Sequence, residues 1–255
     1  MNATGDMGEA ESREPAALTT PARILAVGAL FLGPLFWCVG LLLRTQAVSS
    51  AAFTDDEVAR YAAEPFAVRE QLAAYAANPA LATAGYATFL IGAILLVPAT
   101  WALARLAVRR SPWLATSGGV LMVFGLVARV YFAGVDQVAF QLVDSQGLDA
   151  AAAWVLNTYV DTSYGPWHIP VTAAFGQYLG MPLLAAGLYR ARVFGGVRTL
   201  VLLWWATMWV GVLKTAGWWD FIAGATFFIV LAALAIRVSR HGEPQLRRGR
   251  SFLSW

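Results

Sequence analysis

The chain is poor in cysteine, histidine and charge. It has one cysteine, Cys38, and two histidines, which excludes a disulfide framework, an iron–sulfur cluster and a structural zinc site. The sequence also lacks a P-loop, a dinucleotide-binding glycine motif, a GxSxG elbow and an HExxH motif. Only 13% of the residues are charged and 59% are hydrophobic, which is too apolar a composition for an ordinary water-soluble surface.

Long uncharged runs dominate instead. A helix needs about 20 apolar residues to cross a hydrocarbon core about 30 Å thick. Four candidate spans are about this long. Two shorter ones, Thr199–Leu213 and Phe221–Ile236, are uncharged for about 15 residues each, or roughly 23 Å of helix. We predict that both still span by snorkelling at their ends, with a re-entrant hairpin as the alternative. The six predicted spans are residues 24–43, 81–104, 112–136, 168–189, 197–214 and 218–237.

The predicted fold class is therefore all-α, a polytopic integral membrane bundle of six transmembrane helices over residues 22–238. Residues 1–21 form a polar N-terminal tail and residues 239–255 a basic C-terminal tail. Thirteen arginines fall in the two tails and in the even-numbered turns, whereas the stretch from Gly134 to Trp167 has acidic residues and no basic one. By the positive-inside rule we predict a multi-pass plasma-membrane protein with both termini cytoplasmic.

Two outer loops carry helix signals. Thr54-Asp55-Asp56-Glu57 is typical of a capping box, and a second helix is predicted over Phe66–Ala77. Asn78-Pro79 supplies an N-cap and a first-turn proline for the second span. In the second outer loop, Asp149 is predicted to cap a helix over Ala150–Tyr159. We expect these short helices to cover the bundle at its outer face.

Arg129 is the least expected residue, because a central membrane arginine costs at least about 2.5 to 3.5 kcal/mol. Asp136 follows seven residues later on the same helical face. Two interpretations stay open: Arg129 pairs with an acid and pins two helices, or it binds a phosphate or carboxylate from the outer leaflet. The candidate polar or ligand site in the outer half comprises Arg129, Asp136, Asp161, His168, Gln177 and Asp220. The chain does not bring enough histidines to one side for a metal site.

A candidate aromatic pocket comes from the fifth span, which carries Trp204, Trp205 and Trp209. Packing against neighbouring helices is one explanation. The other is a pocket in which Asp220, beside several tryptophans, protonates an isoprenoid and the indole faces stabilise the carbocation. Gly176-Gln177-Tyr178-Leu179-Gly180 is a GxxxG pattern that favours close helix approach on the fourth span.

Four short features resemble a broad group of uncharacterised six-helix bacterial membrane proteins common in actinobacteria. They are Ala22-Arg23-Ile24, Ala77-Asn78-Pro79, the arginine at Arg129, and Leu188-Tyr189-Arg190-Ala191-Arg192. The resemblance covers about residues 22–238 and implies a six-helix fold but no particular activity. Phe194-Gly195-Gly196 replaces the proline-arginine pair expected after the fourth span.

Three kinds of function remain open. The first is a non-enzymatic membrane or partner-binding factor with a polar outer-leaflet cavity. The second is an enzyme that acts on a lipid or isoprenoid, and the third is a small-solute transporter, for which repeats and broken helices are expected. The expected partners are the lipid bilayer, a lipid or isoprenoid-like small molecule and a membrane protein. We expect no nucleic acid, no metal and no cofactor.

Overall fold

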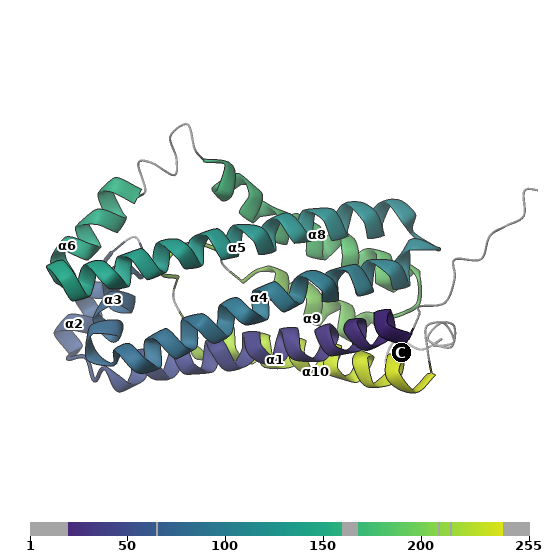
Figure 1. Ribbon diagram of the computed structural model, residues 1–255, viewed down its shortest axis with the longest axis horizontal. Coiled ribbons are helices and arrows are strands. Elements are labelled where there is room, and N and C mark those ends of the chain that lie inside the picture. Colours follow the sequence, from purple (N-terminus) through teal and green to yellow (C-terminus); the bar gives the residue numbers. More distant parts are fainter. Residues whose placement is uncertain (1–19, 65, 160–167, 209, 215, 242–255) are drawn as a thin grey trace, which may run out of the picture.

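The structure is a computed structural model that describes residues 20–64, 66–159, 168–208, 210–214 and 216–241. The described part is all-helical, which confirms the all-α part of the predicted fold class (Figure 1). Its helices in chain order are α1 (Thr20–Ser50), α2 (Asp55–Ala62), α3 (Val68–Ala77), α4 (Pro79–Val108), α5 (Pro112–Gln146), α6 (Leu148–Ala153) with the π-helical turn η1 (Trp154–Tyr159), α8 (Ile169–Arg190), α9 (Gly196–Ala206) and α10 (Trp218–His241).

Helices α1, α4, α5, α8 and α10 are long and apolar enough to cross a membrane, which indicates a membrane-embedded protein. They lie side by side along the long axis of the molecule (Figure 1). The start of α1 and the end of α10 lie at one end, which we call the proximal end. Helices α2, α3 and α6 lie at the opposite, distal end.

Glycine allows the backbones of two helix pairs to touch. A Cβ built on Gly92 of α4 would lie 2.8 Å from Trp37 Cα of α1. Between α5 and α8, a Cβ on Gly118 would lie 2.6 Å from Leu184 N, and one on Gly176 2.9 Å from Gly125 N. The close approach predicted from the GxxxG pattern is therefore confirmed, and the glycines that receive it belong to α5.

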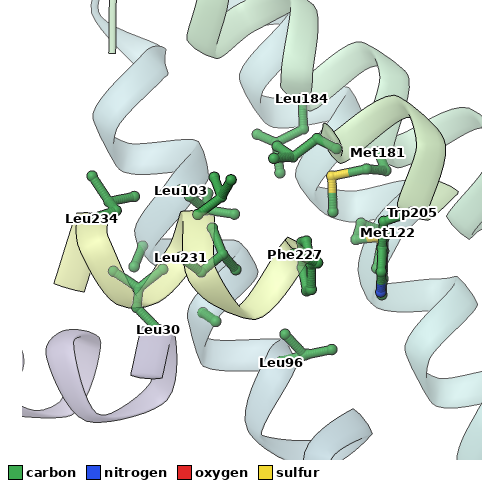
Figure 2. Close-up of a cluster of buried hydrophobic side chains, with 14 of the residues drawn as sticks. Leu30, Leu96, Leu103, Met122, Met181, Leu184, Trp205, Phe227, Leu231 and Leu234 are labelled. Atoms are coloured by element: carbon green, nitrogen blue, oxygen red, sulfur yellow. The ribbon is translucent and has the colours of Figure 1, made fainter. Parts of the chain in front are cut away.

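The main hydrophobic core lies between the long helices, and Figure 2 shows part of it. It combines side chains from α1, α4, α5, α8, α9 and α10. Its largest fully buried members include Leu30, Leu103, Met122, Trp205 and Phe227. Trp205 stacks on Phe227 with ring centroids 4.3 Å apart, which fixes α9 against α10.

A smaller core holds the distal helices together. It packs Leu72 and Tyr75 of α3 against Phe140 of α5 and Val155 of η1. Arg69 of α3 donates to the carboxylates of Glu64 and Asp149, so α3 and α6 are joined by an ion pair.

The predicted caps at the distal end are partly right. The capping box between Thr54 and Glu57 is present at the start of α2, and the Asn78 side chain accepts a hydrogen bond from Leu81 N at the start of α4. The predicted cap at Asp149 is wrong. Helix α6 begins two residues earlier than predicted, at Leu148, after Gly147 with φ 89°, so Asp149 lies in the first turn. Its carboxylate is engaged by Arg69 instead.

The predicted fifth span, residues 197–214, is wrong as a continuous helix, because α9 ends at Ala206. We call residues 207–217, which lead to the start of α10, the connector; its described residues, 207–208, 210–214 and 216–217, have no regular structure. Leu213 within it has φ 43°, a left-handed conformation that a leucine rarely adopts. The helix gives way because side chains from other helices bind the connector's backbone, as described below.

Candidate functional site

Arg129 lies inside the bundle and bonds to an amide rather than to an acid. Its Nε and Nη2 donate to Gln177 Oε1 of α8 at 2.9 and 2.7 Å, and its guanidinium lies 4.4 Å from the centroid of the Trp37 ring. Only 5% of Arg129 and none of Gln177 is exposed. Gly125, one turn before Arg129, brings the α8 backbone close at Gln177, which lets the two side chains meet.

The predicted pairing of Arg129 with an acid is therefore wrong. Among the described residues no carboxylate lies within 4.0 Å of it. The physical reason is the register of α5 and α8, which places Gln177 next to the guanidinium, while Asp136 lies about 10 Å further along the helix. The predicted proximity of Arg129 and Gln177 is confirmed by their hydrogen bonds.

A second arginine, Arg44 of α1, is also buried, with 2% of its surface exposed. Its Nη2 donates to Tyr86 Oη of α4 at 3.1 Å and to the Lys214 carbonyl of the connector at 2.6 Å. Its guanidinium lies 4.1 Å from the Tyr86 ring centroid. Gly85 makes room for its stem, because a Cβ there would lie 2.9 Å from Arg44 Cγ. No carboxylate of the described chain forms an ion pair with Arg44.

The connector is held by side chains of three helices. Asp136 of α5 accepts from Leu213 N at 2.8 Å, and Tyr178 of α8 accepts from Val210 N at 2.8 Å. Gln177 Nε2 donates to the Met208 carbonyl at 3.2 Å, and Arg44 donates to the Lys214 carbonyl. A backbone without helical bonds is tolerated in a membrane only where protein satisfies it, and here side chains satisfy it.

Three cationic groups surround one ring. Arg44 Cζ and Arg129 Cζ each lie 5.5 Å from the Phe89 centroid, and Lys214 Nζ lies 6.0 Å from it. The nearest described acid is Asp220, whose Oδ1 lies 3.9 Å from Lys214 Nζ. This group of positive charges lies in an interior of low dielectric, where it attracts anions strongly.

Hydrogen-bond donors near these cations lack acceptors. Arg44 Nε, Trp37 Nε1 and Trp205 Nε1 are buried, and none donates to an acceptor in the described part of the chain. Trp37 is within 5.2 Å of the Trp205 ring and 4.1 Å of Phe89, centroid to centroid, so these donors belong to the same region. A buried donor without an acceptor costs about 1 to 3 kcal/mol. The region therefore has an excess of both positive charge and donors, and we call it the cationic site (Arg44, Arg129, Lys214, Trp37 and Trp205).

A cavity of about 550 Å³ borders the site at the distal end. Tyr61 of α2, Glu70 of α3 and Lys214 of the connector are among its lining residues. Burial raises the pKa of the Glu70 carboxyl, so this acid holds its proton to a higher pH than an exposed one. Lys214, which lines the cavity, also accepts a hydrogen bond from the Arg44 guanidinium through its carbonyl.

The structure does not bring together all predicted site residues. Asp136 is buried but bonds to the connector, and Asp220 bonds to Gly217 N at the start of α10 and pairs with Lys214. His168 is exposed at the start of α8. Asp161 lies outside the described residues.

The tryptophans predicted to form an aromatic pocket do not lie together: one is in the core and another is at the surface. Trp205 is fully buried between Trp37 and Phe227, whereas Trp204 is 39% exposed. Trp209 lies outside the described residues. Within the described chain, no group of three or more His, Cys, Asp or Glu residues could hold a metal ion.

Sequence reasoning missed Arg44, Lys214, Tyr86 and Tyr178 as site residues. Arg44 directly follows the first uncharged run, and Lys214 is the last residue of the predicted fifth span, so both are expected at a membrane boundary and not inside the bundle. A usable signal for Arg44 is that the residues after it, 45–54, are again uncharged, and α1 does continue as helix to Ser50.

Comparison with known proteins gives no match to a protein family, a curated protein or a solved structure.

Proposed function

We propose that this protein is a non-enzymatic membrane protein that binds the anionic group of an amphiphile, a carboxylate or a phosphate, at the cationic site. The observation that carries the proposal is the pair of buried arginines, Arg44 and Arg129, without a carboxylate partner among the described residues, next to buried donors without acceptors. An anion supplies the missing charge and the missing acceptors together.

The proposal includes six crossings, with α9 and the connector as the fifth, and both chain ends in the cytoplasm. The distal end is then the outer face of the plasma membrane. Trp113 at the start of α5 is 86% exposed, as expected for a residue in the inner aromatic belt. Arg129 lies 16 residues further on, or about 24 Å along the helix, which places it in the outer half of a core about 30 Å thick.

Ligand binding tests the proposal directly. Protein purified in mild detergent is titrated with decyl phosphate and decanoate, and binding is followed by calorimetry. We expect wild type to bind at least one of them and Arg129→Gln to lose at least about tenfold in affinity, because a charge-assisted hydrogen bond contributes about 1.5 to 3 kcal/mol. The matched control is Arg60→Gln, because Arg60 is a largely exposed arginine of α2. No binding, or equal losses in both variants, contradicts the proposal.

A search for the native ligand complements the titration. Wild type and Arg129→Gln are purified with their native lipids, and co-purifying small molecules are identified by mass spectrometry. An anionic amphiphile that recurs in wild type and is depleted in Arg129→Gln identifies the ligand class. An identical set of lipids in both preparations counts against an anion-binding Arg129.

Cysteine labelling tests the topology. In a Cys38→Ala background, Arg60→Cys in α2 and Arg109→Cys after α4 are treated in intact cells with a membrane-impermeant maleimide. The proposed topology predicts labelling at position 60 only. Labelling at 109 only reverses the orientation, and labelling at both positions contradicts the proposed number of crossings.

A small-solute transporter is the second candidate, because α9 is broken halfway along the bundle. Transporters bind substrates where helices are interrupted near the membrane midplane. The connector supplies such an interruption beside Gln177 and Arg129. Proteoliposomes distinguish the two functions: uptake of a small organic anion, abolished by Arg129→Gln, favours transport, whereas binding without uptake favours the non-enzymatic binding protein.

A further inference from the structure

A groove between α4 and α5 has a volume of about 370 Å³ and borders the cationic site, because Tyr86 in its wall accepts a hydrogen bond from Arg44. Its buried lining consists of Tyr75, Asp136 and Phe140. Exposed residues form its rim, so that it opens on the side of the bundle: Thr83 and Ala87 of α4, and Gln137 and Gln141 of α5.

The groove changes from apolar to polar along its length. Toward the proximal end of the bundle the groove is lined by Ala87, Leu90 and Ala133, and toward the distal end by Gln137 and Gln141. From Ala133 to Gln141 the helix rises about 12 Å. With the distal end outside the membrane, the apolar end lies in the outer leaflet and the polar end lies at the headgroup level, as an amphiphile requires.

Asp136 points to the polar group that would bind. Its Oδ1 accepts from Leu213 N, whereas its Oδ2 accepts no hydrogen bond from any described residue. The residue is 7% exposed and lines the groove. This oxygen is not among the fully buried side-chain atoms, so a hydrogen-bond donor of a ligand in the groove can reach it.

The surrounding charge decides which donor fits. Arg44, Arg129 and Lys214 gather around Phe89, three residues from Tyr86 in the groove wall. A ligand ammonium would be repelled by these three cations, whereas a hydroxyl would donate to Asp136 without adding charge.

We propose that this groove binds a neutral long-chain alcohol from the outer leaflet. Its hydroxyl donates to Asp136 Oδ2, and its chain lies along Ala87, Leu90 and Ala133. The aromatic wall is preformed, because Tyr75 stacks on Phe140 with centroids 4.3 Å apart and Tyr86 meets Phe140 edge-on at 4.9 Å.

Photolabelling tests the proposal with the full chain in detergent micelles. A hexadecanol carrying a diazirine in its chain is photolysed with the protein, and labelled peptides are identified by mass spectrometry. We expect labelling of the α4 and α5 segments that line the groove. Unlabelled hexadecanol should displace the probe, and hexadecylammonium should not. Displacement by hexadecylammonium as strong as by hexadecanol overturns the choice of a hydroxyl.

Two variants make the test specific. In Asp136→Asn, the amide oxygen still accepts from Leu213 N, but an NH₂ group replaces the acceptor that faces the groove. Ala133→Leu fills the apolar end, and Ala84→Leu on the exposed side of α4 is its control, because Ala84 does not line the groove. We expect labelling to fall at least about tenfold in the first two and to stay within twofold in Ala84→Leu.

Unchanged labelling in both Asp136→Asn and Ala133→Leu overturns the proposal. If Asp136→Asn fails to fold, Ala133→Leu against Ala84→Leu still decides it. No anionic amphiphile is present in this assay, so a failure of anion binding at the cationic site does not change its outcome.

Discussion

Replacing Gly125 by alanine would force α5 and α8 apart where the Arg129–Gln177 bonds form. The new Cβ would lie 2.9 Å from Gln177 Cβ and 3.0 Å from its Cα, and nearer still to its backbone nitrogen. Restoring ordinary contact requires a shift of about 1 Å, which stretches bonds of 2.7 and 2.9 Å beyond hydrogen-bonding distance. Overpacking lowers the free energy of unfolding by about 1 to 3 kcal/mol, and the loss of the charged hydrogen bonds lowers it by about 1.5 to 3 kcal/mol. The higher helix propensity of alanine raises it by up to about 1 kcal/mol.

We therefore expect Gly125→Ala to lower the free energy of unfolding by about 2 to 5 kcal/mol. The transition temperature should fall by about 5 to 15 °C. Tryptophan fluorescence during heating of the detergent-solubilised protein measures it, since the chain has 11 tryptophans. The control is Gly134→Ala in the same helix, where nothing lies within 4 Å of an added Cβ. Equal transition temperatures for the two variants would refute the reasoning.

Three more outcomes are expected at the distal end. Burial raises the pKa of Glu70, so the folded state binds more protons than the unfolded state and loses stability as pH rises from about 4.5. The thermal transition temperature of Glu70→Gln should therefore be higher than that of wild type at about pH 7 and equal to it at about pH 4. Arg69→Met removes the ion pairs to α6, so hydrogen exchange across residues 148–153 should speed up, with no change in α10. Thr54→Ala removes the capping box with Glu57 and should destabilise α2 by about 1 kcal/mol, seen as faster exchange confined to residues 55–62.

The long helices could be predicted from the sequence because uncharged length alone identifies them. The predicted span 168–189 and the helix Ile169–Arg190 agree within one residue at each end. Helices α1, α4 and α5 are longer than their uncharged runs, because their backbone hydrogen bonds continue through polar residues such as Arg44 and Gln137. The start of α9 agrees with the predicted fifth span, but its end at Ala206 could not be predicted, because the connector is bound by side chains far away in the sequence.

The site was predictable only in part. Periodicity places Arg129 inside the bundle, and the GxxxG pattern places α8 close to α5, but the register that joins Arg129 to Gln177 depends on glycines of both helices. The pairing of Asp136 with Leu213 N was beyond sequence reasoning, because a backbone donor becomes available only where a helix breaks. Arg44 was missed for the same reason, since its acceptor is a carbonyl of the connector.

The glycine-lined contacts between α1 and α4 and between α5 and α8 have a consequence for biogenesis. Each pair is close in the chain, so each can associate soon after leaving the ribosome. Helix α9 leaves the ribosome after both pairs, and the connector that follows it has few backbone hydrogen bonds of its own. Its insertion should thus wait for polar side chains already fixed in the earlier pairs, and variants that lack those side chains should accumulate as a partly inserted, protease-sensitive chain.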